Sequence, residues 1–165
     1  MTRKSVLVAL LAFVLALPAM AIAQSPNFSG KWIQDMEKSD PPAQGMGGGG
    51  GRGPAGPQSF TIAQTATEIA IERETPNGVM KSVFKLDGSE SVNVGGRGGE
   101  VKSKTKWDGA KLVTTSVQTM NMQGNDVTIE STETRSLEAD GTMTVVTVRK
   151  TPNGETTRKL VFKKA

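Results

Sequence analysis

Alternation of side-chain character along short segments is the feature that most constrains how this chain folds. Residues 100–107 read E-V-K-S-K-T-K-W, which puts the charged residues on one face of an extended strand and Val, Ser, Thr and Trp on the other. A helix would scatter these lysines around its circumference. The dipeptide Asp108-Gly109 follows directly and is typical of a two-residue hairpin turn. The pattern therefore predicts two antiparallel strands joined by a tight turn.

Turn signals separate similar segments along most of the chain. The sequence T-P-N-G occurs at residues 75–78 and again at 151–154, each time between two segments of strand character. Pro and Gly supply the backbone angles that such turns need. We expect strands near residues 29–34, 59–64, 68–74, 79–86, 90–94 (a weak one), 100–107, 110–120, 126–137, 142–150 and 155–163. The prediction is an all-β domain, an antiparallel up-and-down meander of about 8–10 strands that closes into a barrel, since closure removes edge strands.

The N-terminal residues 1–23 have the features of a secretory signal peptide. Arg3 and Lys4 precede an apolar run over residues 6–17, and the small residues of A-I-A complete the segment. An uncleaved membrane anchor is the alternative, but a span needs about 20 apolar residues. We expect cleavage after residue 23, a mature single domain over residues 24–165, and a periplasmic or secreted protein.

Two glycine-rich stretches lack the side chains to pack. Residues 41–57 read P-P-A-Q-G-M-G-G-G-G-G-R-G-P-A-G-P, and ordering so many glycines costs conformational entropy without burying side chains. We therefore predict a flexible loop there. Residues 95–99, G-G-R-G-G, resemble an anion-binding loop but precede no helix whose N-terminus would supply donors. They are expected to form a mobile turn.

The residue types that this chain lacks exclude several kinds of chemistry. It has no His, no Cys and no Tyr, so a histidine base, a thiolate nucleophile, a disulfide and a phenol acid are all excluded. No pair of carboxylates is marked out by spacing either, and we expect neither an enzyme nor a metal or other cofactor. The basic residues form no concentrated patch with interleaved aromatics, so no nucleic-acid partner is expected.

The segment N-F-S-G-K-W at residues 27–32 resembles the opening motif of the lipocalins and fatty-acid-binding proteins, the calycin barrels. The resemblance implies a lipocalin-like barrel in which Trp32 closes the bottom. It also implies an arginine packed across this Trp as a structural contact, for which Arg158 is the best match and Arg149 the second choice. The segment E-K-S at 37–39 is similar to one in small secreted bacterial lipocalin-like proteins.

Two departures from the fatty-acid-binding proteins bear on the ligand. Those proteins place two helices after their first strand, where this chain has the glycine-rich residues 45–57. They also end in an Arg-x-Tyr that binds a carboxylate, whereas Phe162 stands near the end of this chain. On this ground, capture of a carboxylate is not expected.

The inward faces of the predicted strands give the candidate site for a small hydrophobic or amphipathic ligand, such as a lipid. Its predicted lining is Phe60, Ile71, Phe84, Trp107, Met120 and Arg135. One face of residues 126–137 runs from Ile129 through Glu133 to Arg135. Turned inward, this face makes a wet, partly polar cavity that anchors a polar head group; turned outward, it is a solvated charge pattern. Strand register decides between the two, and sequence alone does not fix it.

A filled barrel is the alternative reading of the same strands. The protein would then be a structural or interaction protein that meets partners through its glycine-rich loop or through the face of Lys102, Lys104 and Lys106. That lysine face is otherwise a solvent face that prevents edge-to-edge association. In either case we expect a monomer with no membrane span after cleavage of the signal peptide.

Overall fold

Ten antiparallel strands make up the structure, a computed structural model that describes residues 25–41, 57–75, 78–95, 99–122 and 125–165. No helix occurs in these residues. The strands are β1 (Gly30–Gln34), β2 (Ser59–Gln64), β3 (Glu68–Thr75), β4 (Gly78–Lys85), β5 (Asp87–Val94), β6 (Glu100–Asp108), β7 (Lys111–Met122), β8 (Asn125–Leu137), β9 (Met143–Thr151) and β10 (Gly154–Lys164). Every predicted strand is present, and the weak one is β5, which begins earlier than expected.

Some sequence predictions concern residues outside those that the structure describes. They are the signal peptide at 1–23, the flexible loop at 41–57 apart from its end residues Pro41 and Pro57, and the centre of the glycine turn at 95–99. These remain predictions.

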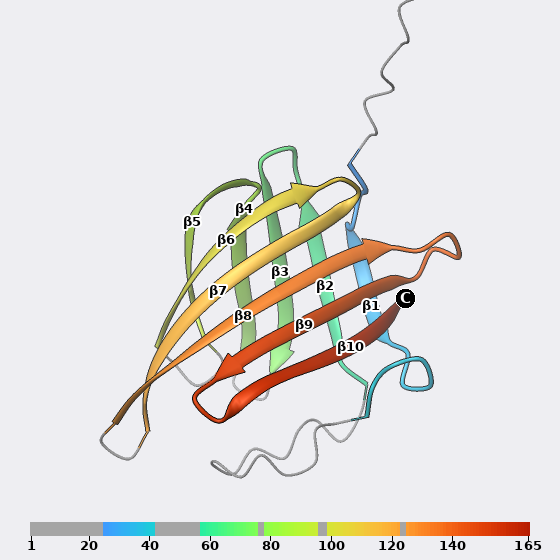
Figure 1. Cartoon of the computed structure of the whole chain (residues 1–165). Helices are drawn as coiled ribbons and strands as arrows, with labels where there is room; N and C mark the ends of the chain where they lie inside the picture. Colours follow the sequence, from blue (N-terminus) through green and yellow to red (C-terminus); the bar gives the residue numbers. More distant parts are fainter. Residues whose placement is uncertain (1–24, 42–56, 76–77, 96–98, 123–124) are drawn as a thin grey trace, which may run out of the picture.

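The strands form one sheet that curves round on itself (Figure 1). Each pairs antiparallel with its neighbours in the chain, except at β4 and β5, and β1 pairs with β10. Trp32 of β1 lies opposite Phe60 of β2 and Lys164 of β10, so it sits where the first and the last strand of the chain pair, in the middle of the sheet order. The predicted meander is confirmed. The barrel is nearly but not fully closed, because β4 and β5 are the two edges of the sheet and do not pair with each other.

The hairpin predicted at Asp108-Gly109 is centred one residue later. Asp108 pairs with Lys111, which leaves Gly109 and Ala110 as the turn. Gly109 has a φ of 58°, in the left-handed region that a side chain disfavours. The glycine of the D-G signal therefore does set this turn, as its first central residue.

Side chains bridge the seam between β4 and β5. The amide of Asn93 in β5 accepts a hydrogen bond from the Val83 backbone N–H at 2.8 Å and donates one to the Val83 carbonyl at 3.0 Å. Two residues earlier, the Ser91 hydroxyl accepts a hydrogen bond from the backbone N–H of Lys85 at 2.9 Å. The Asn93 side chain thus imitates a peptide group of a neighbouring strand, and it satisfies an edge that would otherwise lack partners.

We expect Asn93→Ala to lower the free energy of unfolding by about 1–3 kcal/mol, since it leaves both Val83 backbone groups unpaired. Hydrogen exchange of the Val83 amide should accelerate by about tenfold or more. The amide of Ala70, in β3 on the other side of β4, serves as the internal control. Equal exchange of the Val83 amide in the two proteins would show that the bridge does not hold the seam.

Aromatic side chains fill the end of the barrel at which the chain enters β1. Trp32 is fully buried, and its indole N–H donates to the Phe28 carbonyl at 2.8 Å. The Phe28 ring stacks on Trp107 with centroids 5.9 Å apart. Gln64 fixes this segment, because its amide accepts from the Phe28 N–H and donates to the Pro26 carbonyl. The same buried cluster contains Phe60, Ile62, Ile69, Ile71, Leu86, Leu112, Met143, Val145 and Phe162.

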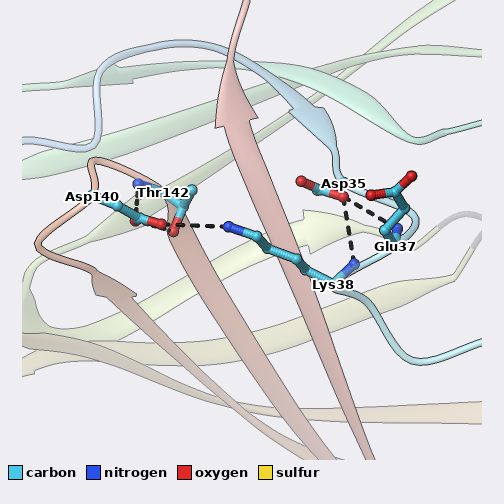
Figure 2. Close-up of polar contacts among 5 residues, drawn as sticks. All are labelled: Asp35, Glu37, Lys38, Asp140 and Thr142. Atoms are coloured by element: carbon cyan, nitrogen blue, oxygen red, sulfur yellow. Dashed lines mark hydrogen bonds and ion pairs between the residues drawn. The ribbon is translucent and has the colours of Figure 1, made fainter.

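Polar contacts hold the turn after β1 against the turn between β8 and β9 (Figure 2). The Asp35 carboxylate accepts from the backbone N–H groups of Glu37 at 3.1 Å and Lys38 at 3.4 Å. The Lys38 ammonium reaches Asp140 at 3.5 Å, and hydrogen bonds from the Thr142 hydroxyl and amide lower the pKa of Asp140. This ion pair is more than half exposed, so it orients the turn and contributes little stability.

Candidate functional site

The barrel interior contains a partly open cavity that borders the aromatic cluster at Phe60 and Phe162. Its volume is about 360 Å³. The lining consists of Gln58, Phe60, Arg73, Glu133, Arg135, Val145, Thr147, Arg149, Thr156, Arg158, Leu160 and Phe162. A second cavity of about 270 Å³ shares Arg73, Glu133, Thr147 and Arg149 with the first, so the two adjoin. The barrel is therefore not filled by its own side chains.

Strand alternation explains why this interior is half polar. In β8 the inward face runs from Ile129 through Ser131 and Glu133 to Arg135, and all four residues line a cavity. The sequence left two readings of this face open, and the structure selects the inward one. Its apolar counterpart is a group that includes Phe60 and Phe162, whose rings meet edge to face at 4.8 Å.

Arg135 is the most deeply buried charge of the site. Its side chain is 5% exposed and forms an ion pair with Glu133 on the same strand. The Arg135 Nε atom has no hydrogen-bond partner among the described residues, and neither has the buried Nε of Arg158. A buried donor without a partner costs about 1–3 kcal/mol, so these two guanidiniums favour an acceptor that enters the cavity.

Arg73 extends into the cavity from β3. Its guanidinium lies over the Phe60 ring at 5.3 Å from the centroid, a cation–π contact. Burial and then the positive charge of Arg135 lower the pKa of Arg73, while the Glu133 carboxylate opposes them. An arginine in a protein keeps its charge at neutral pH. The two guanidiniums line the same cavity, and their positive charges oppose each other.

Three of the residues predicted to bind a ligand line the two cavities. Phe60 and Arg135 line the first cavity, and Phe84 lines the second. They belong to β2, β8 and β4, which lie apart in the sequence and are brought together by the curvature of the sheet.

Three other predicted residues lie elsewhere. Ile71 is buried in the apolar cluster, and Trp107 packs on Phe28 at the aromatic end. Met120, on the face of β7 that carries Gln118, lies further towards the long β7–β8 hairpin and in neither lining. Alternation identified the correct face of these strands, but depth along the barrel depends on the stagger between strands, which alternation does not report.

The predicted contact between Arg158 and Trp32 needs correction. The cation over the Trp32 ring is Lys164, with its Nζ 5.4 Å from the ring centroid. Lys164 pairs with Trp32 across β1 and β10, whereas Arg158 lies six residues earlier in β10, about 20 Å along the strand. Arg158 instead lines the cavity, and so does the second choice, Arg149.

Arg73 and Arg149 are cavity residues that sequence reasoning did not assign to the site. A signal for both was present. Arg73 continues the inward face of Ile69 and Ile71 in β3, and Arg149 continues the face of Val145 in β9. The chain lacks the Arg-x-Tyr motif of the fatty-acid-binding proteins, but these arginines still supply cationic groups to the cavity.

The lysine face of β6 is directed to solvent. Lys102, Lys104 and Lys106 are all exposed. Lys102 lies 3.6 Å from Glu100 and 4.0 Å from Glu90.

The described residues contain no group of His, Cys, Asp and Glu that could hold a metal ion. They also contain no helix long and apolar enough to cross a membrane.

No protein-family model matches this chain, and no curated protein does. Solved structures do match. A zebrafish ileal bile acid-binding protein complexed with cholic acid is 16% identical, with a TM-score of 0.58 over 84% of this chain and 98% of that chain. A fatty acid transporter, REP1-NXSQ, is 19% identical, with a TM-score of 0.56 over 83% and 95%.

A fatty-acid-binding protein from Echinococcus granulosus is similar as well. It is 13% identical, with a TM-score of 0.50 over 84% of this chain and 97% of that chain. Identities this low show a shared fold, and they confirm the barrel that the resemblance at residues 27–32 implied.

Proposed function

Because the chain has the fold of these bile-acid- and fatty-acid-binding proteins, we propose that it is an exported protein that holds a small amphipathic molecule inside its barrel. The observation that carries the proposal is the cavity of about 360 Å³, which lies in the range of about 300–1,000 Å³ typical of ligand sites. A barrel packed with side chains would leave no such space. The solved relatives include a complex with cholic acid, an amphipathic acid, which supports the same kind of ligand.

The lining suggests how such a molecule would lie. Phe60, Leu160 and Phe162 offer apolar surface on the side of the aromatic end. Arg135 presents a donor in the row of Leu160, and Arg158 presents one in the next inward-facing row along the cavity. An amphipathic ligand would pack its apolar part on the first group and direct its polar head to the second.

Native mass spectrometry of the protein purified from its own compartment tests the proposal directly. We expect a small molecule bound at one-to-one stoichiometry. We also expect the protein mass to be that of a chain that starts at Gln24, after removal of residues 1–23. A chain that keeps residues 1–23 would contradict export with cleavage.

A cavity-filling variant tests the location of the ligand. Thr147→Trp places an indole in the space that both cavities share, whereas Val148→Trp adds the same ring on the outer face of β9. We expect the first variant to weaken ligand binding at least about tenfold, because overpacking displaces the ligand or its neighbours. The second should bind as the original protein does. Equal binding by both would place the ligand outside the barrel, and circular dichroism checks that both remain folded.

A further inference from the structure

The charges of the two cavities are strongly unbalanced. Their described lining contains four arginines, Arg73, Arg135, Arg149 and Arg158, and one carboxylate, Glu133. The net charge of these groups is therefore +3. Arg149 is exposed, whereas the other three guanidiniums are buried or half-buried, and positive groups in a partly apolar space repel one another more strongly than they would in water. An anion that entered the cavity would stabilise this arrangement.

The guanidiniums converge from both sides of the cavity. Along β8, β9 and β10, Glu133 and Arg158 flank Thr147 in one row of cross-strand partners, so their strands lie about 10 Å apart. Arg135 lies in the next inward-facing row, opposite Val145, which is nearer the aromatic end. Arg73 reaches the same space from β3, where its charge interacts with those of Arg135 and Glu133.

Two of these groups have donors ready for an acceptor. Arg135 is 4% exposed and Arg158 is half-buried, and the Nε–H of each lacks a hydrogen-bond partner among the described residues. A guanidinium binds phosphate and carboxylate oxygens through parallel hydrogen bonds. An anionic head group at this point would therefore satisfy donors that the chain leaves unpaired.

The charge count indicates how many negative charges the head group carries. Glu133 neutralises Arg135, which leaves three further guanidiniums in the lining. A head group with a single charge leaves most of this excess, whereas a phosphate monoester carries about −1.5 to −2 and three acceptor oxygens. Resting on the proposed function, we propose that the barrel selects an amphiphile with a doubly negative head group of the phosphate monoester class, bound among Arg73, Arg135 and Arg158.

Calorimetric titration with three amphiphiles that share one alkyl chain tests this selection. The probes are octanol, octyl sulfate and octyl phosphate, used as monomers at constant ionic strength. Sulfate and phosphate esters have the same shape and differ in charge. At pH 7.5 we expect octyl phosphate to bind at least about tenfold more tightly than octyl sulfate, and octanol to bind most weakly.

The same preference should depend on pH through the ligand. A phosphate monoester loses its second proton with a pKa of about 6, so at pH 5 it is mostly a monoanion. The ratio of the two dissociation constants should then approach one. Both esters meet the same Glu133 and the same arginines at each pH, so a change in the protein that affects the two ligands equally leaves the ratio unchanged.

A pair of neighbouring substitutions locates the head group. Arg158→Gln removes a cavity charge, and Lys159→Gln removes an equal charge from the exposed outer face of β10. We expect the first to reduce the preference for octyl phosphate by about tenfold and the second to leave it unchanged. Equal effects of the two would mean that the preference reflects overall charge and would overturn the assignment to the cavity.

The remaining outcomes separate the two proposals. Equal affinity for octyl phosphate and octyl sulfate at pH 7.5 overturns the doubly negative head group and leaves the binding function standing. Binding of none of the three probes overturns the binding function itself. Inorganic phosphate that binds as tightly as octyl phosphate would identify a site for free phosphate and overturn an amphiphile as the ligand.

Discussion

Replacing Trp32 with alanine is expected to lower the free energy of unfolding by about 3–5 kcal/mol. The side chain is fully buried, its N–H donates to the Phe28 carbonyl at 2.8 Å, and it belongs to the cluster that fills one end of the barrel. Removing it leaves a cavity and an unpaired carbonyl. Because β1 joins β2 to β10, the loss also weakens the closure of the barrel. Urea denaturation followed by circular dichroism measures the change.

Two further variants serve as comparisons for Trp32→Ala. Trp32→Phe keeps most of the buried volume and loses the hydrogen bond, so it should cost less than the alanine variant. Met36→Ala removes a side chain that is 47% exposed just beyond β1 and should change stability by less than about 0.5 kcal/mol. A similarly small effect of Trp32→Ala would show that the indole does not support the barrel end.

The strands could be predicted because their local patterns agree with their tertiary environment. In β6, Ser103 and Thr105 are buried while the three lysines between and beside them are exposed, as period-two alternation requires. The tight turn after β6 was predicted for the same kind of reason, since Gly109 adopts a backbone angle that other residues avoid. Such features depend on neighbours in the sequence.

Features that depend on stagger could not be predicted in this way. Trp32 meets Lys164 and not Arg158 because β1 and β10 pair in one particular register, and several registers preserve the same inward faces. The open seam is similar. β4 and β5 each have strand character, and only the folded sheet shows that they do not pair and that the Asn93 side chain bonds to Val83 across the seam between them.

The polar cavity could be predicted only in part. Alternation placed Glu133 and Arg135 on one face of β8, but it left open whether that face was turned inward. Closure of the barrel decides the question, because the apolar residues of β2 and β10 on the same side, Phe60 and Phe162, are buried. A candidate site with one expected arginine thereby becomes a site with four.

Neutralising Glu133 provides the second large effect. We expect Glu133→Gln to lower the free energy of unfolding of the ligand-free protein by about 2–4 kcal/mol, since it leaves the buried Arg135 without its ion-pair partner. The four guanidiniums would then face one another with no carboxylate in the described lining. Glu130→Gln, on the exposed face of the same strand, is the matched control and should change stability by less than about 0.5 kcal/mol.

The double variant Glu133→Gln with Arg135→Met distinguishes the cause of this loss. If an uncompensated charge is responsible, removing the arginine as well should restore much of the stability, because both partners of the pair are then gone. If Glu133 acts through packing alone, the two losses should add.

Octyl phosphate should also stabilise Glu133→Gln at least as much as the original protein, since the variant keeps every guanidinium and loses the one group that repels the ligand. Weaker stabilisation of the variant would contradict the placement of the anionic head group among these guanidiniums.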